Sequence, residues 1–389
     1  MDITIHPRPL RGTIEIIPSK SQAHRLLICA AFADTATYLR CADTNRDIEA
    51  TADCLRSLGA DIQRTEDGYT ILPIRCVPSQ AQLNCCESGS TLRFMLPIAG
   101  ALGVDTLFWM EGRLPQRPLS PLWEEMERMG CSLTRPTGNT IRCQGKLKCG
   151  EYRIDGSISS QFITGLLFAT ALLGGGSTVT VTGNLESKPY LDMTKHALSL
   201  FDSPNFRSPG RLSVEGDWSN GAFFLAAKQL GSDLQIFGLD NGSLQGDRVV
   251  ADILQQLSAG SPTISAKDIP DLVPILSVVA AVNYGAVFTD IRRLRIKESD
   301  RVASTIAMLA GLGGKAHADE NTLTVLGTGL NGGTVDAVND HRIAMSAAIA
   351  ATICKQDVTI LGAQCVQKSY PKFWDAYLRL GGLYEQYIR

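Results

Sequence analysis

A short pattern at the ends of predicted helices recurs six times along the chain and constrains the fold more than any other feature. It consists of an apolar residue, two further residues, a second apolar residue and, in its clearest copies, a glycine, as in LRSLG, MERMG and LAGLG. Glycine suits this place because helices often end with a residue in the left-handed region. After each of these three copies, apolar residues recur at every second position on both sides of a turn, which predicts a β-hairpin. The chain therefore repeats one α/β unit.

The spacing of the repeat divides the chain into six units of unequal length. The intervals between copies are 71, 72, 56, 55 and 68 residues, because the fifth position of the pattern falls at residues 59, 130, 202, 258, 313 and 381. The segments after residues 202 and 258 leave room for about one strand rather than two. We infer that the third and fourth units are each shortened by about one strand. Three units in each of two domains is the natural division, with a boundary near residues 213–221.

The composition excludes several classes of partner. The chain has 389 residues, 44% of them hydrophobic and 20% charged, which is typical of soluble globular proteins. Its formal net charge of -2 provides no overall field for nucleic acid or for an anionic membrane surface. The longest apolar stretches are too short to span a membrane. We expect neither nucleic acid nor membrane as a partner.

The cysteines and histidines indicate a reducing compartment and no metal site. The eleven cysteines are an odd number and contain no CxxC pair, and the first ten residues have no apolar signal region. These features predict a cytoplasmic protein with free thiols. The five histidines show no metal-ligand spacing with one another or with cysteine.

Several predicted helices begin with a polar cluster suited to anions, because helix N-termini offer unpaired N–H groups and partial positive charge. The clusters are SKSQAHR (19–25), ESGSTLR (87–93), SISSQ (157–161), KESDR (297–301) and NDHR (339–342). Capping alone explains the Ser and Asp residues. It does not explain cations in the first turn, where the helix dipole disfavours them. Such cations are Lys20, Arg25, Arg93, Lys297, Arg301 and Arg342. Together they predict a shared ligand with more than one anionic group.

Three further places fit this interpretation, although each alone is more often an ordinary structural feature. Arg113 and Arg117 lie in a proline-rich loop, and Lys368 lies just before a predicted helix. Asp271 lies at the entry to an apolar helix, where it is either a simple N-cap or a general base among cations. GTGLNG at 327–332 matches a dinucleotide-binding pattern, but no helix opens after it, so we discount that site.

A set of motifs in one fixed order resembles the 5-enolpyruvylshikimate-3-phosphate synthase family of enolpyruvyl transferases. The motifs span nearly the whole chain, so the resemblance is specific. They are PSKSQAHR, ESGSTLRF, QRPLSPL, DGSISSQF, SKPYLD, VEGDWS, SLQGDR, IPDLVP, LRIKESDR, NDHRIAM and KSYPKFW.

The resemblance implies an α/β protein with the two-domain enolpyruvyl-transferase fold, an inverse α/β barrel of six repeated units. The chain would cross twice between the domains, which gives one domain over residues 19–215 and another over residues 1–18 and 216–389. The ligands would bind in the cleft between the domains. The implied reaction transfers the enolpyruvyl group of phosphoenolpyruvate to the 5-hydroxyl of shikimate 3-phosphate and releases phosphate. No metal or redox cofactor is implied, and we expect a monomer.

The resemblance also implies roles for individual residues. Asp271 would take the proton of the 5-hydroxyl, and Glu298, with Lys20, would handle protons at the methylene carbon. Phosphoenolpyruvate would be held by Lys20, Gly89, Arg117, Gln161, Arg301, Arg342 and Lys368. Shikimate 3-phosphate would be held by Lys20, Ser21, Arg25, Ser159, Ser160, Gln161, Ser187, Tyr190, Asp271 and Lys297.

The chain departs from the family pattern in three places. Glu87 stands where many members have Asn, which brings a negative charge close to the phosphoenolpyruvate site. Arg293 stands where some members have an Asn that contacts the shikimate moiety. The two shortened units expose sheet edges, which are either covered by a partner chain or tolerated.

Two alternative functions remain open at this point. One is an enolpyruvyl transferase acting on a UDP-sugar, whose chemistry commonly uses a Cys in a glycine-rich loop; the corresponding stretch here has none. The other is a degenerate homologue that binds anions without catalysis. Retention of both Asp271 and Glu298 argues against it, because binding alone does not require them.

Overall fold

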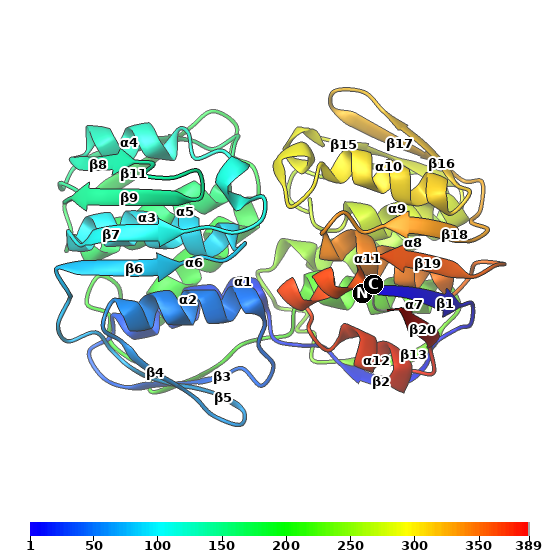
Figure 1. Ribbon diagram of the computed structural model, residues 1–389, viewed down its shortest axis with the longest axis horizontal. Coiled ribbons are helices and arrows are strands. Elements are labelled where there is room, and N and C mark those ends of the chain that lie inside the picture. Colours follow the sequence, from blue (N-terminus) through cyan, green and yellow to red (C-terminus); the bar gives the residue numbers. More distant parts are fainter. Residues whose placement is uncertain (388–389) are drawn as a thin grey trace. The chain divides into compact units, whose positions relative to one another are not determined.

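The computed structural model describes residues 1–387, and these residues form two compact units (Figure 1). The continuous unit runs from Pro18 to Glu215. The discontinuous unit combines Met1–Ile17 with the chain from Gly216 onward. Each unit has its own hydrophobic core. The chain thus passes from one unit to the other near residues 17 and 215.

Within the described residues, the strands of the continuous unit form three sheets. The first has the order β12-β3-β5-β4, with β3 at Thr37–Arg40, β4 at Asp61–Arg64, β5 at Gly68–Leu72 and β12 at Arg211–Ser213. The second has the order β6-β7-β9-β8, with β6 at Gln80–Asn84, β7 at Asp105–Trp109, β8 at Cys131–Thr134 and β9 at Thr140–Gly145. The third pairs β10 (Glu151–Asp155) with β11 (Thr178–Thr182) in parallel.

The discontinuous unit follows the same plan. One sheet has the order β14-β15-β17-β16, with β14 at Thr263–Ser265, β15 at Gly285–Thr289, β16 at Lys315–Ala318 and β17 at Thr322–Leu326. Another has the order β18-β19-β1-β20, with β1 at Asp2–His6, β18 at Gly333–Asp336, β19 at Val358–Leu361 and β20 at Leu383–Tyr387. The third pairs β2 (Arg11–Glu15) with β13 (Asp233–Phe237) in parallel. The N-terminal strand β1 thus lies beside β20 at the other end of the chain (Figure 1).

Each unit contains three helices that are buried over most of their length. In the continuous unit they are α1 (Lys20–Ala31), α3 (Gly89–Leu102) and α5 (Ser160–Leu172). In the discontinuous unit they are α7 (Trp218–Gln229), α9 (Val273–Val282) and α11 (His341–Ala351). Their sequences are apolar on nearly every side, which is typical of helices enclosed by other elements. This arrangement agrees with the predicted inverse barrel.

The remaining helices expose one face or are short. They are α2 (Arg46–Ser57), α4 (Leu122–Arg128), α6 (Lys188–Leu200), α8 (Val250–Ala259), α10 (Arg301–Gly311) and α12 (Phe373–Arg379). Short 3-10 turns complete the set: η1 (Leu114–Gln116), η2 (Gly246–Val249), η3 (Arg292–Ile296) and η4 (Ala363–Lys368). Among the described residues, none of the helices combines the length and apolar character that crossing a bilayer requires.

The helix-end pattern corresponds to a backbone conformation. Gly59, Gly130, Gly313 and Gly381 have φ values of 107°, 113°, 84° and 83°, and Asp202 has 50°. A residue in this region stops the helix and turns the chain toward the following strand. At the remaining position, 258, helix α8 continues to Ala259 instead.

The two shortened units lie where we predicted them, and along the chain each has one strand after its second helix where a complete unit has a hairpin: β12 after α6 and β14 after α8. The β10-β11 and β2-β13 sheets have two strands each, whereas the other sheets within residues 1–387 have four. Each of these sheets is nevertheless two strands short, because the one strand that remains in each unit joins another sheet. The single strands that follow α6 and α8, β12 and β14, pair with β3 and β15 of other sheets. In chain order β12 and β14 belong to the shortened units, although in the fold they belong to other sheets.

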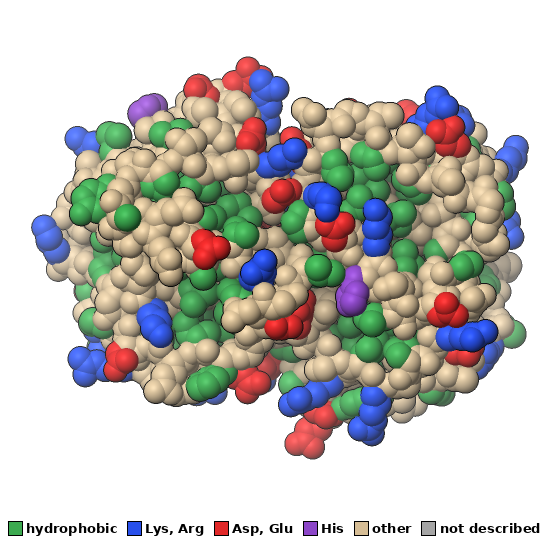
Figure 2. Space-filling view, turned by 180° about the vertical axis from the view of Figure 1, so that it is seen from behind, with side chains coloured by type: hydrophobic (Ala, Val, Ile, Leu, Met, Phe, Trp, Pro, Cys, Tyr) green, Lys and Arg blue, Asp and Glu red, His purple; other side chains and the backbone are tan. Residues whose placement is uncertain are grey.

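Charged side chains of both signs are interspersed on the visible face of each unit (Figure 2). This agrees with a formal net charge close to zero. Any concentration of positive charge is therefore local, and the helix N-termini are the places to look for it.

Candidate active site

The polar clusters predicted at helix starts do lie there, and most contain a capping side chain. Side-chain oxygens of the cap residues accept hydrogen bonds from backbone N–H groups of the first turn. The cap residues are Ser19 of α1, Ser88 of α3, Ser159 of α5, Asp300 of α10 and Asp340 of α11. Capping therefore accounts for these five residues, while the cations beside them require another explanation.

In the continuous unit, Arg25 is buried and holds α1 against α6. Its Nε donates to Thr194 Oγ1 at 2.9 Å and its Nη2 to the Tyr190 carbonyl at 3.0 Å. Its Nη1 donates to the Ser21 carbonyl at 2.7 Å. The guanidinium also lies over the rings of Phe94 and Tyr190. Ser21 and Tyr190 thus lie beside the buried guanidinium of Arg25.

A second cationic cluster surrounds the first residue of α3. A Cβ added to Gly89 would lie 2.6 Å from Nη1 of both Arg93 and Arg117. Arg93 Nη1 donates to Gln161 Oε1 at 2.9 Å, and Gln161 Nε2 donates to Ser90 Oγ at 2.9 Å. A side chain at this position would therefore displace one or both guanidinium groups. Three of the predicted phosphoenolpyruvate residues, Gly89, Arg117 and Gln161, therefore meet at one helix N-terminus.

The other predicted residues of this unit also lie at helix starts. Lys20 opens α1, and its Nζ lies 3.0 Å from Asp47 Oδ2. Ser160 opens α5 and is buried, and Ser187 precedes α6 with a positive φ of 56°. A non-glycine residue in this conformation is uncommon and clusters at functional sites.

In the discontinuous unit, Asp271 is the acid predicted as general base, and cations surround it. Its Oδ1 accepts from Arg301 Nη1 at 2.7 Å, and its Oδ2 accepts from Arg342 Nη2 at 3.2 Å. Lys297 Nζ lies 4.0 Å from Oδ1. Burial is the largest influence on Asp271 and opposes its ionisation, but Arg342, Lys297 and Arg301 together hold its pKa well below the usual range. Asp271 is therefore a carboxylate with 21% of its side chain exposed.

Arg301 joins three carboxylates and is almost completely buried, with 1% of its side chain exposed. Besides Asp271, it donates from Nη2 to Glu298 Oε2 at 2.6 Å and from Nε to Asp340 Oδ2 at 3.1 Å. All three guanidinium nitrogens are thus engaged. Because a guanidinium has five N–H groups, Nη1 retains a second N–H beyond its bond to Asp271.

Lys297 has an unusual environment for a lysine. Burial is the main influence and lowers its pKa to about 8, while Asp271 acts in the opposite direction. The charges of Arg293 and Arg301 contribute to this lowering of the pKa, and that of Glu298 opposes it. Lys297 is therefore a cation that loses its proton close to the physiological range.

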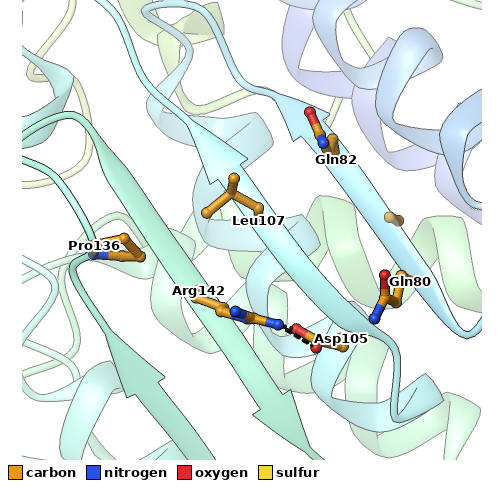
Figure 3. Close-up of a pocket in the computed structure, with 7 residues that line it drawn as sticks. Gln80, Gln82, Asp105, Leu107, Pro136 and Arg142 are labelled. Carbon is orange, nitrogen blue, oxygen red and sulfur yellow. Dashed lines mark hydrogen bonds and ion pairs between the residues drawn. The ribbon is translucent and has the colours of Figure 1, made fainter.

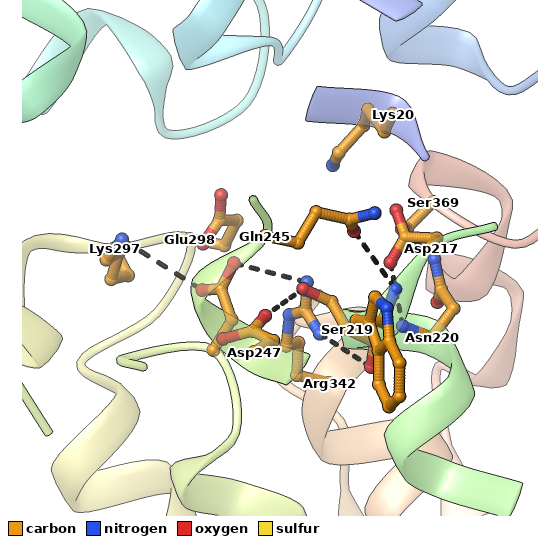
Figure 4. Close-up of polar contacts among 12 residues, drawn as sticks. Lys20, Asp217, Ser219, Asn220, Gln245, Asp247, Lys297, Glu298, Arg342 and Ser369 are labelled. Atoms are coloured by element: carbon orange, nitrogen blue, oxygen red, sulfur yellow. Dashed lines mark hydrogen bonds and ion pairs between the residues drawn. The ribbon is translucent and has the colours of Figure 1, made fainter. Parts of the chain in front are cut away.

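A pair of residues that we did not predict lies behind Arg342. Ser219 donates its hydroxyl to Asp247, and the Ser219 carbonyl accepts from Arg342 Nη1 at 3.4 Å (Figure 4). Burial, with the charge of Asp271 nearby, raises the pKa of Asp247. Asp247 and Ser219 therefore form a buried polar layer beneath the Arg342–Asp271 pair.

The last predicted cation of this unit is also near the start of α11. Lys368 is buried in η4, and its Nζ donates to the Asn339 carbonyl at 2.8 Å. Asn339 lies three residues before Arg342 in the chain. Lys368 and Arg342 thus approach the same helix terminus from different elements.

The remaining arginines of the charge-rich run at 292–301 lie in two environments, one at the surface and one buried. Arg292 and Arg295 pair with Glu320 and Asp300 in exposed positions. Arg293 is buried and contributes to the environment of Lys297. The departure at Glu87 lies elsewhere, against Gly112 in the loop after β7.

Three acids of these clusters were given no role from the sequence: Asp47, Asp247 and Asp340. Arg93 was recognised as a cation at a helix start but was not assigned to a substrate. The acids carry no local signal, because their role depends on cations distant in the chain. Asp340 lies 39 residues from Arg301, and Asp47 lies 27 residues from Lys20.

Elsewhere, the exposed face of the β6-β7-β9 strands is hollowed beside an ion pair between Arg142 and Asp105 (Figure 3). The hollow is lined by Gln80, Ala81, Gln82, Asp105, Leu107, Pro136 and Arg142. It contains none of the residues predicted for the site. The described residues contain no group of three or more His, Cys, Asp or Glu side chains arranged for a metal ion.

The sequence profile of the family described as "EPSP synthase (3-phosphoshikimate 1-carboxyvinyltransferase)" matches residues 5–268 and 261–377. The 3-phosphoshikimate 1-carboxyvinyltransferase of Clostridium kluyveri is 37% identical over 414 residues, covering 98% of this chain and 97% of the relative. The protein of the same name from Clostridium acetobutylicum is 38% identical over 416 residues, covering 98% and 97%.

A solved structure shows the same fold. EPSP synthase from Acinetobacter baumannii superposes with a TM-score of 0.77 at 21% sequence identity, covering 99% of this chain and 100% of that one. At this identity the likeness concerns the fold alone.

Proposed function

Since the chain belongs to the EPSP synthase (3-phosphoshikimate 1-carboxyvinyltransferase) family, we propose that it transfers the enolpyruvyl group of phosphoenolpyruvate to the 5-hydroxyl of shikimate 3-phosphate. Phosphate is the second product. Both substrates carry a phosphate and a carboxylate, which suits the two sets of cations described above.

The observation that carries the proposal is the environment of Asp271. Asp271 is ionised and 21% exposed, so it can accept the proton of a bound hydroxyl when substrate anions draw away Arg301 and Arg342, whose charges otherwise weaken it as a base. Asp271 is the proposed general base for the 5-hydroxyl.

The reaction needs proton transfer at carbon as well as at oxygen. As the 5-hydroxyl oxygen bonds to the central carbon of phosphoenolpyruvate, Asp271 takes its proton and the methylene carbon gains one, which gives a tetrahedral intermediate. The bond to phosphate then breaks, and the new methyl group loses a proton to restore the double bond. Glu298 is the proposed group for the protons at carbon, with Lys20 as the second candidate. The surrounding cations stabilise the phosphate as it leaves.

The binding roles follow the two clusters. Phosphoenolpyruvate is proposed to contact Lys20, Gly89, Arg117, Gln161, Arg301, Arg342 and Lys368. Shikimate 3-phosphate is proposed to contact Lys20, Ser21, Arg25, Ser159, Ser160, Gln161, Ser187, Tyr190, Asp271 and Lys297. Arg301 already binds three carboxylates, so its proposed contribution to phosphoenolpyruvate uses the second N–H of Nη1 or displaces one of them.

A phosphate-release assay with both substrates tests the function. We expect phosphate release that requires shikimate 3-phosphate as well as phosphoenolpyruvate. Glu298→Gln should lower kcat by at least about a hundredfold, the usual scale for loss of a general acid or base, with shikimate 3-phosphate binding retained. Glu320→Gln, an exposed acid of the same unit, is the matched control.

The outcomes separate the alternatives. Binding of shikimate 3-phosphate without turnover would identify a degenerate homologue. Turnover with a UDP-sugar instead would overturn the substrate assignment. An unchanged kcat in the Glu298 variant would remove Glu298 from the proton transfers while leaving the function intact.

A cytoplasmic location is proposed on separate grounds. All eleven cysteines are free, and eight of them are buried. Free thiols persist in a reducing compartment.

A further inference from the structure

Strand β11 ends its sheet at a place where a complete sheet continues. In the complete sheet of the same unit, β7 pairs with β6 on one side and β9 on the other. β11 pairs with β10 in the same parallel way as β7 pairs with β6. Within residues 1–387, no strand occupies the place beside β11 that corresponds to β9. The outer edge of β11 is therefore open.

The missing strands leave an apolar surface incompletely covered. Val179 and Val181 of β11 pack on the core but are only half-buried. The same holds for Leu167, Ala171 and Leu172 of α5, the helix that packs against β11. Apolar side chains along an open sheet edge favour an added strand.

This edge also lacks the features by which sheet edges usually avoid pairing. Charged residues, prolines and bulges are the common protections. The segment 174–185, GGGSTVTVTGNL, contains no charge and no proline. The equivalent open strand in the other shortened unit, β13, begins with Asp233. β13 therefore offers an internal comparison.

The hydrogen-bonding groups of β11 show which residues would bind a partner. Thr178 N–H donates to the Gly150 carbonyl, and the Thr182 carbonyl accepts from Gly156 N–H. Both groups point toward the β10 side. Because the backbone groups of successive strand residues point to opposite sides, those of Val179 and Val181 point to the open edge.

The sequence of β11, TVTVT, reads the same in both directions. Antiparallel pairing of two copies centred on Thr180 puts Val179 opposite Val181 and Thr178 opposite Thr182. The valine pairs are then the hydrogen-bonded pairs, which agrees with the direction of their backbone groups. Valine faces valine on the core side, and threonine faces threonine on the outer side, where such pairs stabilise a sheet.

We propose that the β11 edge is a dimerisation surface, where a second copy of this chain adds its own β11 in antiparallel pairing about Thr180. The result is one sheet with the order β10-β11-β11-β10, which restores the four strands of a complete sheet. A second copy fits better than an unrelated peptide because the edge is complementary to itself in side chains, backbone groups and lack of charge. The dimer replaces the monomer expected from the sequence.

Sedimentation velocity of the full chain over a concentration series tests the proposal. One pair of short strands buries less area than a standard interface, so we expect a dissociation constant for the dimer on the order of 10 µM. The mass should rise with concentration from 41.9 kDa toward twice that value.

Matched charge variants locate the contact. Thr180→Glu places two carboxylates opposite each other across the axis and should weaken the dimer at least about tenfold. Gln235→Glu introduces a carboxylate at an exposed position of the comparison strand β13 and should leave the dissociation constant of the dimer unchanged. Neither residue belongs to the proposed site, so both variants should retain wild-type phosphate release.

A cross-link provides a readout that does not depend on affinity. Residues opposite each other in a pair that is not hydrogen-bonded have Cα atoms about 4.5 Å apart, within reach of a disulfide. Thr180→Cys, in a background where the exposed Cys76 and Cys149 are Ser, should therefore form a disulfide-linked dimer under mild oxidation. Gln235→Cys in that background should not.

Three results would overturn the proposal. They are a wild-type chain that stays at 41.9 kDa up to about 100 µM, a dimer that survives Thr180→Glu unchanged, and equal cross-linking of the two cysteine variants. A stable complex between β11 and a different protein, with no self-association, would also exclude the second copy as the occupant.

Discussion

At the scale of single residues, the candidate site depends on how charges are paired away from water. Asp271 stays ionised only because three cations outweigh its burial. Arg301 is tolerated in the interior because three carboxylates surround it. The residue types were visible in the sequence, whereas the partners were not.

Lys297 leads to a prediction about pH. Its pKa is lowered to about 8, below the ordinary value of about 10.4, so the free protein loses this cation as pH rises through 8. Above that pH, kcat/KM for shikimate 3-phosphate should fall by about tenfold for each pH unit. Steady-state kinetics between pH 6 and about 9.5 measure the profile.

The variant Lys297→Arg tests whether Lys297 is the group that causes the fall in kcat/KM at alkaline pH. Lys297→Arg should move the alkaline limb upward, because a guanidinium stays protonated. Lys315→Arg, an exposed lysine of β16, is the control. An alkaline limb that is identical in wild type and Lys297→Arg would assign it to another group.

At the scale of elements, the repeated helix ends follow from a local backbone requirement. Gly130 ends the helical segment before β8 with φ of 113°, and a Cβ there would lie 2.9 Å from the Lys146 carbonyl oxygen. This requirement concerns one residue and its neighbours, so it is readable from the sequence. Strand membership is different, because β12 pairs with β3, more than 170 residues earlier.

Gly130→Ala should therefore lower the free energy of unfolding by about 1–2 kcal/mol, the cost of a Cβ in the left-handed region. Denaturant unfolding followed by circular dichroism measures the change. Gly138→Ala is the control, since a Cβ there meets nothing within 4 Å and its φ is outside that region. Equal stability of both variants would contradict the backbone explanation of the repeat.

At the scale of the whole molecule, each unit contains a complete set of sheet partners. Every strand pair of the continuous unit, including β3 with β12, lies within Pro18–Glu215. Its core is also separate from that of the other unit. The domains predicted at 19–215 and at 1–18 with 216–389 differ from these units by one residue.

We therefore expect residues 18–215 to fold when expressed alone. The fragment should unfold cooperatively in urea, because its hydrogen-bond ladders and core require no other part of the chain. A gradual loss of ellipticity without a transition would show that the unit depends on the rest of the protein. An alanine at Phe168, a fully buried core residue, serves as the destabilised control.

The sequence by itself determined the repeated units, the helix ends, the polar clusters at helix starts and, through its ordered motifs, the family. Each of these depends on residues close together in the chain or on a pattern that the chain repeats. Only the tertiary structure decided that Asp340 and Asp271 neutralise Arg301, that Arg93 and Arg117 both approach Gly89, and that the shortened sheets lack two strands each. Charge burial and strand pairing join residues that are distant in sequence, so their partners are chosen by packing rather than by local pattern.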